Sequence, residues 1–232
     1  MLSDRLMFWA SRPVVQTYTG TMLRMDIQRH ADLPSGPKII AANHPTTTDP
    51  FFVAAMLRQQ SFILINELLF QVPILGAYLR RSGHIPVAAG NGPAAIDTAL
   101  KYLSEGKTVM IFPEGDLSPF NGGFQKPRTG VARLALASGA PVVPVGIHLN
   151  WERVHTIKST VRGRVEYGRW YLRGPYHMTV GKALTFQGSA EDRPQVRQAA
   201  ETVMHHIIEL ARESEIRMDH GFSPLASLPE AL

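Results

Sequence analysis

The sequence predicts an α/β fold in which a mixed, largely parallel central sheet is flanked by helices, with an interfacial helix at the N-terminus. Short apolar runs of strand length alternate along the chain with segments whose apolar residues recur at helical spacing. That alternation is typical of sheets built from strand–helix–strand units. The composition, 44% hydrophobic and 19% charged over 232 residues, is that of a globular protein, and this length is sufficient for one buried core without cross-links.

The predicted strands are apolar runs bounded by turn-forming residues. A first strand over 22–30 is closed by the Gly- and Pro-rich turn 33–37. The runs KIIAAN, FILI and TVMIF predict the buried strands 38–43, 62–65 and 108–112. The remaining strands are expected over 84–87, 142–149 and 177–186.

The predicted helices fill the intervals between these strands and are expected over 51–59, 74–81, 94–104, 131–137 and 191–218. In the third helix Ile96, Leu100 and Leu103 lie at helical spacing, and Gly106 ends the pattern. The last helix is long and amphipathic, so we expect one face of it to pack on the sheet.

The two ends of the chain are expected to differ from this core. Residues 1–21 predict an amphipathic helix whose Phe8 and Trp9 could enter a lipid interface, although a helix packed on the core fits the same pattern. Charged residues interrupt its apolar positions, so we expect no signal peptide. The most apolar later stretch, 62–79, contains polar residues and a proline, so we expect no membrane span there. The tail 219–232, rich in Pro and Gly, is expected to be loosely held.

Two features of the composition bear on function: the absence of cysteine and the position of the excess positive charge. The chain has no cysteine, which excludes a disulfide scaffold, a thiolate nucleophile and a Cys-type zinc site. The net charge of +5 is local, because residues 153–175 hold six basic residues against one acidic residue and the rest of the chain is balanced. We call residues 153–175 the basic segment.

The strongest catalytic candidates are His44 and Asp49, in the run NHPTTTDP that follows the strand 38–43. Sites of α/β proteins lie outside the carboxyl ends of their strands. Asp49 could hold one nitrogen of the imidazole and leave the other free to take a proton from a hydroxyl. Alternatively, Asp49 before Pro50 could be a helix N-cap, and the two roles are compatible.

A second candidate segment is Phe112-Pro113-Glu114-Gly115, at the end of the strand 108–112. It would present the Glu114 carboxylate at the same sheet edge as His44, and Gly115 permits a positive φ. By itself the segment could equally be a surface turn.

The two segments, with those around them, resemble the glycerolipid acyltransferase family, the PlsC-like lysophosphatidic acid and glycerol-phosphate acyltransferases. His44 and Asp49 match the first family motif, of which Asn43 is also typical, and Phe112 to Gly115 match the third. The second and fourth motifs and a basic, Gly-containing segment are matched by Gly83 to Val87, Val143-Pro144-Val145 and Lys126 to Gly130. The resemblance covers roughly residues 37–186, within a predicted acyltransferase domain over 22–218.

The resemblance implies an enzyme that moves a fatty acyl group from an acyl-CoA or acyl-ACP thioester to a lipid hydroxyl, with His44 as general base and Asp49 as its orienter. No covalent acyl-enzyme is implied, which agrees with the absence of cysteine and of a Gly-x-Ser-x-Gly motif. The residues expected at the substrate site are Asn43, Phe112, Pro113, Glu114, Gly115, Lys126, Arg128 and Pro144. We expect no metal and no cofactor besides the acyl carrier, and a cytoplasmic enzyme peripheral to the inner face of the membrane.

Two departures from the family pattern concern the acceptor. The family usually has an arginine shortly after its second motif, where Ala88 stands here, and Thr-Arg after its third, where Asp116-Leu117 stand. Those arginines are associated with holding the acceptor's phosphate, for which their bidentate geometry is suited. Either Lys126 and Arg128 replace them, or the acceptor is not lysophosphatidic acid.

Two rival functions share the fold. One is a non-catalytic module that binds lipid or acyl carrier, which the presence of both His44 and Asp49 disfavours. The other is a thioesterase-like hydrolase, in which water replaces the acceptor.

The basic segment interleaves its charges with Tyr167, Trp170 and Tyr171. This pattern occurs in nucleic-acid binding, and it also suits anionic lipid, the phosphates of coenzyme A or the acidic face of an acyl carrier protein. A solvated hairpin with no specific partner is the remaining alternative. With the acyltransferase motifs, docking on a membrane or on the donor is favoured and nucleic acid is the least favoured partner.

Overall fold

The computed structural model describes residues 13–120, 122–161 and 164–220, apart from the side chains of residues 160, 161, 164 and 166. Phe8 and Trp9, Arg162 and most of the predicted tail lie outside this part of the chain. Residues 13–21 form a helix, so only the last nine of the 21 residues in the predicted N-terminal helix are described.

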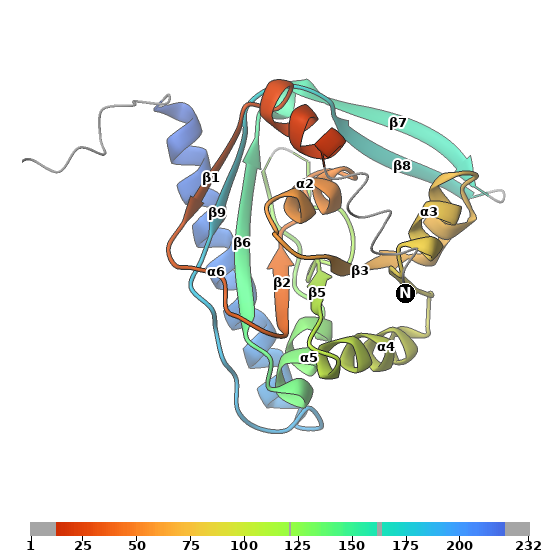
Figure 1. The fold of residues 1–232 in the computed structure, drawn as a ribbon, viewed down its shortest axis with the longest axis vertical. Coiled ribbons are helices and arrows are strands. Elements are labelled where there is room, and N and C mark those ends of the chain that lie inside the picture. Colours follow the sequence, from red (N-terminus) through yellow and green to blue (C-terminus); the bar gives the residue numbers. More distant parts are fainter. Residues whose placement is uncertain (1–12, 121, 162–163, 221–232) are drawn as a thin grey trace, which may run out of the picture.

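The core of the fold is a seven-stranded sheet with the order β1-β9-β6-β2-β5-β3-β4 (Figure 1). Its strands are β1 (Met25–Arg29), β2 (Lys38–Ala42), β3 (Ser61–Asn66), β4 (Ile85–Val87), β5 (Thr108–Ile111), β6 (Val142–Leu149) and β9 (Tyr176–Val180). All neighbouring strands pair in parallel except β6 and β9. The predicted mixed, largely parallel sheet is therefore confirmed.

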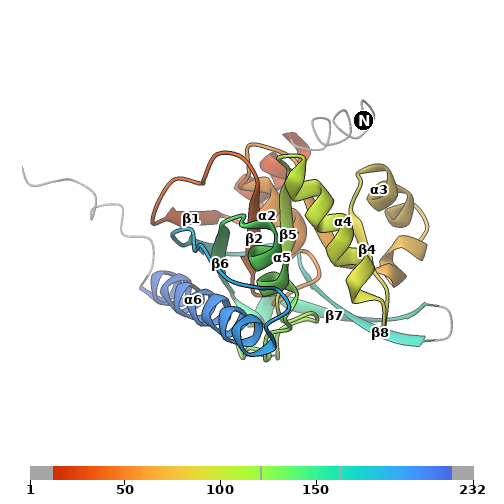
Figure 2. The same cartoon turned by 90° about the horizontal axis from the view of Figure 1, so that it is seen from below.

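Helices cover both faces of the sheet (Figures 1 and 2). The α-helices are α2 (Asp49–Ala55), α3 (Leu75–Arg81), α4 (Gly92–Ser104), α5 (Gly130–Ser138) and α6 (Arg193–Asp219), and η1 (Glu67–Gln71) and η2 (Trp151–Arg153) are 3-10 helices. On one face α4, α5 and α6 pack on the side chains that include Ile39, Val109 and Val142. On the other face, α2 packs on the alternate residues, such as Ile40 and Met110, as the period of a strand requires.

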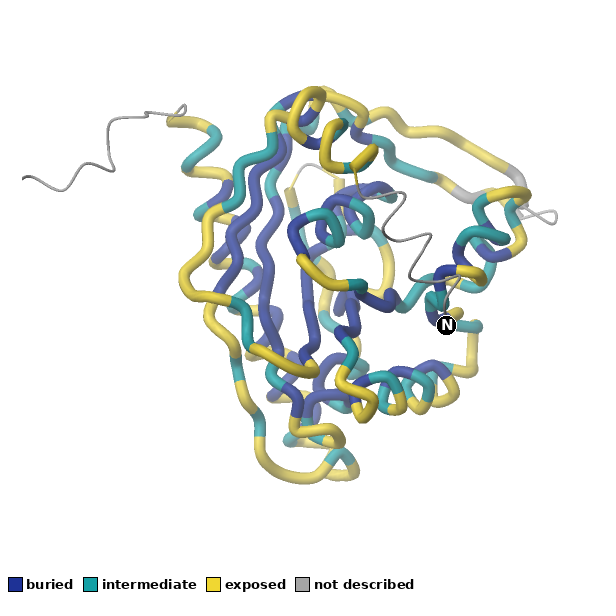
Figure 3. Tube along the Cα trace, viewed as in Figure 1, coloured by how far each residue is buried: buried dark blue, intermediate teal, exposed yellow. Residues whose placement is uncertain are grey.

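The packing of α6 depends on a glycine in β6. A Cβ atom at Gly146 would lie 2.0 Å from the backbone nitrogen of Ala211 in α6, so no side chain fits between the helix and the strand. The long predicted helix therefore lies directly against β6, in the part of the sheet where the tube in Figure 3 is dark blue.

The basic segment contains a two-stranded antiparallel hairpin of β7 (Val154–Val161) and β8 (Arg164–Tyr171), separate from the main sheet. It leaves the end of β6 through η2 and crosses the end of the molecule toward which β2 and β6 point (Figure 1). The hairpin thus passes over the edge of the sheet at which the sequence places His44.

Some element boundaries differ from the predictions. The predicted strand 177–186 ends at Val180, and beyond it only an isolated bridge joins Val142 to Leu184. The reason is Pro144: it accepts a hydrogen bond from the Gly181 N–H at 2.9 Å but has no N–H of its own to continue the antiparallel ladder. The predicted strand 22–30 begins only at Met25, and the predicted helix 51–59 lies over Asp49–Ala55 instead.

No helix in the part of the chain described above is long and apolar enough to cross a membrane.

Candidate active site

The position of His44 is fixed by the asparagine before it. The buried Asn43 side chain donates to the carbonyl of Ile147 at 2.9 Å and accepts from the N–H of the same residue at 2.7 Å. Its amide therefore extends the pairing of β2 with β6 by one residue, and His44 follows at the carboxyl end of the sheet. Both polar groups of Asn43 are engaged in this contact, so its observed part in the site is to place the backbone of His44.

His44 and Asp49 are in contact, as the sequence predicted. The Nδ1 atom of His44 lies 3.2 Å from Oδ2 of Asp49, whose side chain is fully buried, while the His44 side chain is 18% exposed. Asp49 also accepts hydrogen bonds from the Thr46 N–H and hydroxyl, both at 2.6 Å, and from the Tyr176 hydroxyl at 2.8 Å. These contacts fix the carboxylate in one orientation toward the imidazole.

The alternative prediction for Asp49, a helix N-cap, is wrong. Asp49 is the first residue of α2, and Thr48 occupies the N-cap position without a side-chain cap hydrogen bond. The Asp49 carboxylate turns away from the helix because Thr46, Tyr176 and His44 already occupy its acceptor positions.

Phe112, at the end of β5, packs on the other side of the imidazole. The two rings stack with their centroids 4.2 Å apart and an interplanar angle of 25°. The His44 ring is thus held by Asp49 at one edge and by Phe112 on one face, and its side chain stays partly exposed.

Glu114 joins the third motif to the first. Its buried carboxylate accepts from the His44 N–H at 3.0 Å, from the Ser118 hydroxyl at 2.6 Å and from the Gln125 N–H at 2.7 Å. Ser118 also donates its own N–H to the His44 carbonyl at 2.8 Å. The predicted meeting of the two motifs at one sheet edge is therefore observed, with Glu114 bonded to the protein on both oxygens.

Gly115 and Arg128 form the surface of this turn. Gly115 has a φ of +68°, and a Cβ there would lie 2.4 Å from Cδ of Arg128. The Arg128 N–H donates to the Pro113 carbonyl at 2.8 Å, so the arginine side chain lies directly over the glycine. Arg128 is near the motif, as expected.

Lys126 and Pro144, the remaining predicted site residues, differ in burial. Lys126 is exposed. Pro144 is buried inside the sheet at the register of Ala41, three residues before His44 along β2. Asp116 is exposed and accepts from the N–H of Leu117 at 2.7 Å.

Comparison with known proteins gives the family. Residues 24–148, just over half of the chain, match the sequence model of the family described as Acyltransferase. The chain belongs to this family. The resemblance to PlsC-like glycerolipid acyltransferases predicted from the motifs is thereby confirmed.

Three relatives of this acyltransferase-family chain carry the name 1-acyl-sn-glycerol-3-phosphate acyltransferase. The protein of Pseudomonas aeruginosa is 29% identical over 145 residues, 61% of this chain and 53% of the relative. That of Saccharomyces cerevisiae is 26% identical over 210 residues, covering 88% and 63%, and that of Bacillus subtilis is 31% identical over 108 residues, covering 46% and 53%. The chain thus spans between 53% and 63% of the length of these relatives.

A solved structure shares the fold. The 1-acyl-sn-glycerophosphate (LPA) acyltransferase PlsC of Thermotoga maritima superposes with a TM-score of 0.62 over 95% of this chain and 81% of its own, at 18% identity. The sheet and helix arrangement is therefore that of a known acyltransferase structure.

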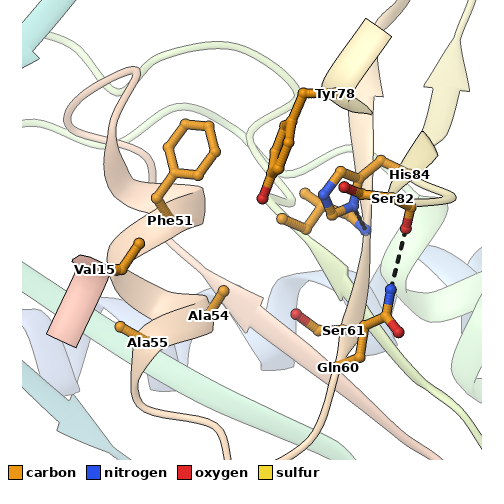
Figure 4. Close-up of a pocket in the computed structure, with 10 residues that line it drawn as sticks. Val15, Phe51, Ala54, Ala55, Gln60, Ser61, Tyr78, Ser82 and His84 are labelled. Carbon is orange, nitrogen blue, oxygen red and sulfur yellow. Dashed lines mark hydrogen bonds between the residues drawn. The ribbon is translucent and has the colours of Figure 1, made fainter. Parts of the chain in front are cut away.

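An apolar pocket lies between α2 and the second motif of this acyltransferase-family chain (Figure 4), and neither His44 nor Asp49 is among its lining residues. Phe51, Ala54 and Ala55 of α2 form one wall, and Tyr78 and His84 face them. Partial burial of His84 lowers its pKa from 6.5 to about 4, and its Nδ1 accepts from the Ile63 N–H at 3.2 Å. The ten lining residues include no Asp, Glu, Lys or Arg, so the pocket suits an apolar group and not a phosphate.

Three residues of the site were missed in the sequence: Ser118, Tyr176 and Arg169. Ser118 bonds to both motifs, Tyr176 to Asp49, and Arg169 reaches the site from the hairpin. Burial, together with the neighbouring Asp49, raises the pKa of Tyr176 well above its ordinary value, so its hydroxyl is a permanent donor to that carboxylate. In each case the partner is distant in sequence and no local pattern indicates it.

In residues 13–220, leaving aside 121, 162 and 163, no group of three or more His, Cys, Asp or Glu side chains is arranged to hold a metal ion.

Proposed function

We propose that this chain is an O-acyltransferase that moves a fatty acyl group from an acyl-CoA or acyl-ACP thioester to a hydroxyl of a lysophospholipid such as 1-acylglycerol-3-phosphate. The observation that carries the proposal is the contact between His44 and the fully buried Asp49 at the carboxyl edge of the sheet. The names of the relatives support the choice of acceptor class.

In the proposed mechanism His44 is the general base. An ionised carboxylate only accepts hydrogen bonds, so Asp49 keeps the imidazole proton on Nδ1 and leaves the lone pair on Nε2. Nε2 takes the proton of the acceptor hydroxyl while the hydroxyl oxygen attacks the thioester carbonyl carbon. The C–S bond then breaks, and the departing sulfur takes the proton from the imidazolium, so that an ester and a free thiol result.

The remaining motif residues have supporting roles in this proposal. Asn43 and Glu114 hold the backbone of His44, and Phe112 fixes the plane of its ring. Preorganisation of this kind favours a reaction in which the acceptor hydroxyl and the thioester must both be positioned at Nε2 of His44.

A second candidate acceptor is a lysolipid or acylglycerol without a phosphomonoester. It is favoured by Ala88, which is apolar, and by Asp116, whose exposed carboxylate would repel a phosphate.

Initial rates with labelled acyl-CoA and either 1-acylglycerol-3-phosphate or monoacylglycerol test the choice of acceptor. We expect the phosphorylated acceptor to be used with the higher kcat/KM. A preference for monoacylglycerol would select the second candidate instead.

We also propose that the outer part of the hairpin docks on a membrane surface. Ile157 and Tyr167 are 52% and 61% exposed there, and the exposed Lys158 pairs across the strands with Tyr167. Exposed apolar and aromatic side chains beside cations are the pattern of peripheral lipid binding. Arg169, by contrast, is turned toward the body of the protein and is not part of this surface.

The double variant Ile157→Ser, Lys158→Gln is expected to weaken binding to vesicles containing phosphatidylserine. One cation near an anionic surface contributes about 1 kcal/mol, equivalent to about a fivefold change in partitioning, and the apolar residue adds to it. Sedimentation with vesicles at low and high salt measures the effect. The control is Ile216→Ser, Arg197→Gln on α6; an equal loss in the control, or no loss in the hairpin variant, would contradict the proposal.

A further inference from the structure

Arg169 of β8 is tied to the loop that carries His44 and Asp49. The Thr47 N–H donates to the Arg169 carbonyl at 2.8 Å, and the Arg169 N–H donates to the Thr47 hydroxyl at 3.1 Å. This reciprocal pair connects the hairpin to the first motif at a point between its two catalytic candidates.

The guanidinium of Arg169 reaches the third motif as well. Its Nη2 donates to the Ser118 carbonyl at 2.5 Å, and Ser118 is itself bonded to the backbone of His44. The ring of Phe120 lies beside the guanidinium, with its centroid 5.9 Å from Cζ. Ser118 therefore links the Arg169 guanidinium to the backbone of His44.

The other terminal nitrogen of Arg169 is unused. Nη1 is buried and has no hydrogen-bond partner in the described part of the chain. Leaving a buried charged donor unpaired costs free energy, and a bound anion is one way to offset that cost. Burial lowers the pKa of Arg169, and the nearby Asp49, Asp116 and Glu114 carboxylates partly oppose this shift.

The proposed acceptor would bring a partner to this place. In 1-acylglycerol-3-phosphate the phosphate is carried by the carbon next to the one that bears the reacting hydroxyl. Its oxygens must therefore lie close to the atom that His44 deprotonates. A planar guanidinium with one free nitrogen is well suited to bind a phosphate oxygen.

We propose that Arg169 binds the phosphate of the acceptor, and that the hairpin thus supplies the cation absent at Ala88 and Leu117. The inference rests on the proposed function. It assigns Arg169 a role in acceptor specificity: the group touches the substrate but not the atoms that react. Coenzyme A also carries phosphates, so the test measures the KM for the acceptor and the KM for acyl-CoA separately to show which phosphate Arg169 binds.

The test compares Arg169→Gln and Arg169→Lys with the wild type and with Arg197→Gln, an exposed charge change on α6. For Arg169→Gln we expect KM for 1-acylglycerol-3-phosphate to rise about 10- to 100-fold, the effect of losing one hydrogen bond to a charged group. We expect kcat, the KM for monoacylglycerol and the KM for acyl-CoA to stay within about twofold, since each lacks this contact in the proposal. Arg169→Lys should recover part of the affinity, because it keeps the charge without the planar fork.

Three outcomes would overturn the inference. An equal loss with the phosphorylated and the uncharged acceptor would assign Arg169 to the structure of the loop. A rise confined to the KM for acyl-CoA would assign it to the donor. Unchanged kinetics in Arg169→Gln would remove it from substrate binding while leaving the proposed function intact.

A binding measurement tests the phosphate site without depending on acyl transfer. Titration calorimetry with glycerol 3-phosphate, without any acyl donor, is expected to show weaker binding to Arg169→Gln than to the wild type. If the wild type binds glycerol 3-phosphate through Arg169 but transfers no acyl group, the proposed function fails and the phosphate site stands. Equal binding to both proteins would contradict the phosphate site.

Discussion

Alanine in place of His44 is expected to lower kcat for acyl transfer by about 10²- to 10⁴-fold, the usual contribution of a positioned general base. Without the imidazole the proposed acceptor of the hydroxyl proton is lost. KM should change little, since neither substrate depends on the ring for its binding in this account. Steady-state rates with saturating acyl-CoA and acceptor measure the effect.

The fold should survive this substitution. The bonds from Glu114 and Ser118 to His44 involve its backbone, so they do not depend on the imidazole. A thermal unfolding curve close to that of the wild type is therefore expected. His205→Ala, at an exposed position on α6, is the matched control, and activity of His44→Ala within twofold of that control would remove His44 from the chemistry.

Asp49→Asn is expected to reduce kcat by a similar factor and to destabilise the fold as well. The amide can no longer impose the Nδ1 tautomer, and losing such an orienting carboxylate costs up to about 10⁴-fold in catalytic triads. Its NH₂ group would also face the N–H or hydroxyl of Thr46, or the hydroxyl of Tyr176, all of which now donate to the carboxylate. A buried donor left unpaired costs about 1–3 kcal/mol.

Two readouts separate these effects: kcat at a temperature well below unfolding, and the midpoint of thermal unfolding. The exposed Asp97→Asn on α4 is the control for the loss of one charge. If Asp49→Asn lowers the unfolding midpoint but keeps a normal kcat, Asp49 is a structural residue of the loop and not the orienter of His44.

The predictable part of the site is local in sequence. His44 and Glu114 each follow an apolar run, and the rule that parallel strands bring their carboxyl ends to one edge placed them together correctly. The contact between His44 and Asp49 spans five residues, so it could also be predicted from the local sequence. The first motif, the third motif and the sheet can therefore all be predicted from the pattern of apolar runs and motif residues in the sequence.

The contacts that complete the site are not local. Tyr176 reaches Asp49 across 127 residues, and Arg169 reaches Ser118 across 51. They exist only because β9 runs antiparallel beside β6 and because the hairpin folds back over the sheet edge. In the sequence Arg169 is one of six similar cations, and nothing there indicates that its side chain points inward.

The basic segment consequently has two parts with different surroundings. Near its base, Arg169 and the buried Tyr171 face the body of the protein. Further out, Tyr167 and Lys158 are exposed to solvent. The net charge of the basic segment therefore adds together cations in two different surroundings. Arg169 is bonded to the loop that contacts the proposed base, whereas Lys158 is exposed on the surface.

The fate of a labelled acyl group tests the central proposal, direct transfer by a histidine base, most directly. Purified protein is mixed with radiolabelled acyl-CoA and 1-acylglycerol-3-phosphate, and the label is separated into lipid ester, free fatty acid and protein-bound acyl group. We predict that the label passes into the ester only when the acceptor is present, without a protein-bound stage, and that His44→Ala abolishes this transfer. Accumulation of free fatty acid at the same rate with and without acceptor, or of a covalent acyl-protein, would contradict direct transfer.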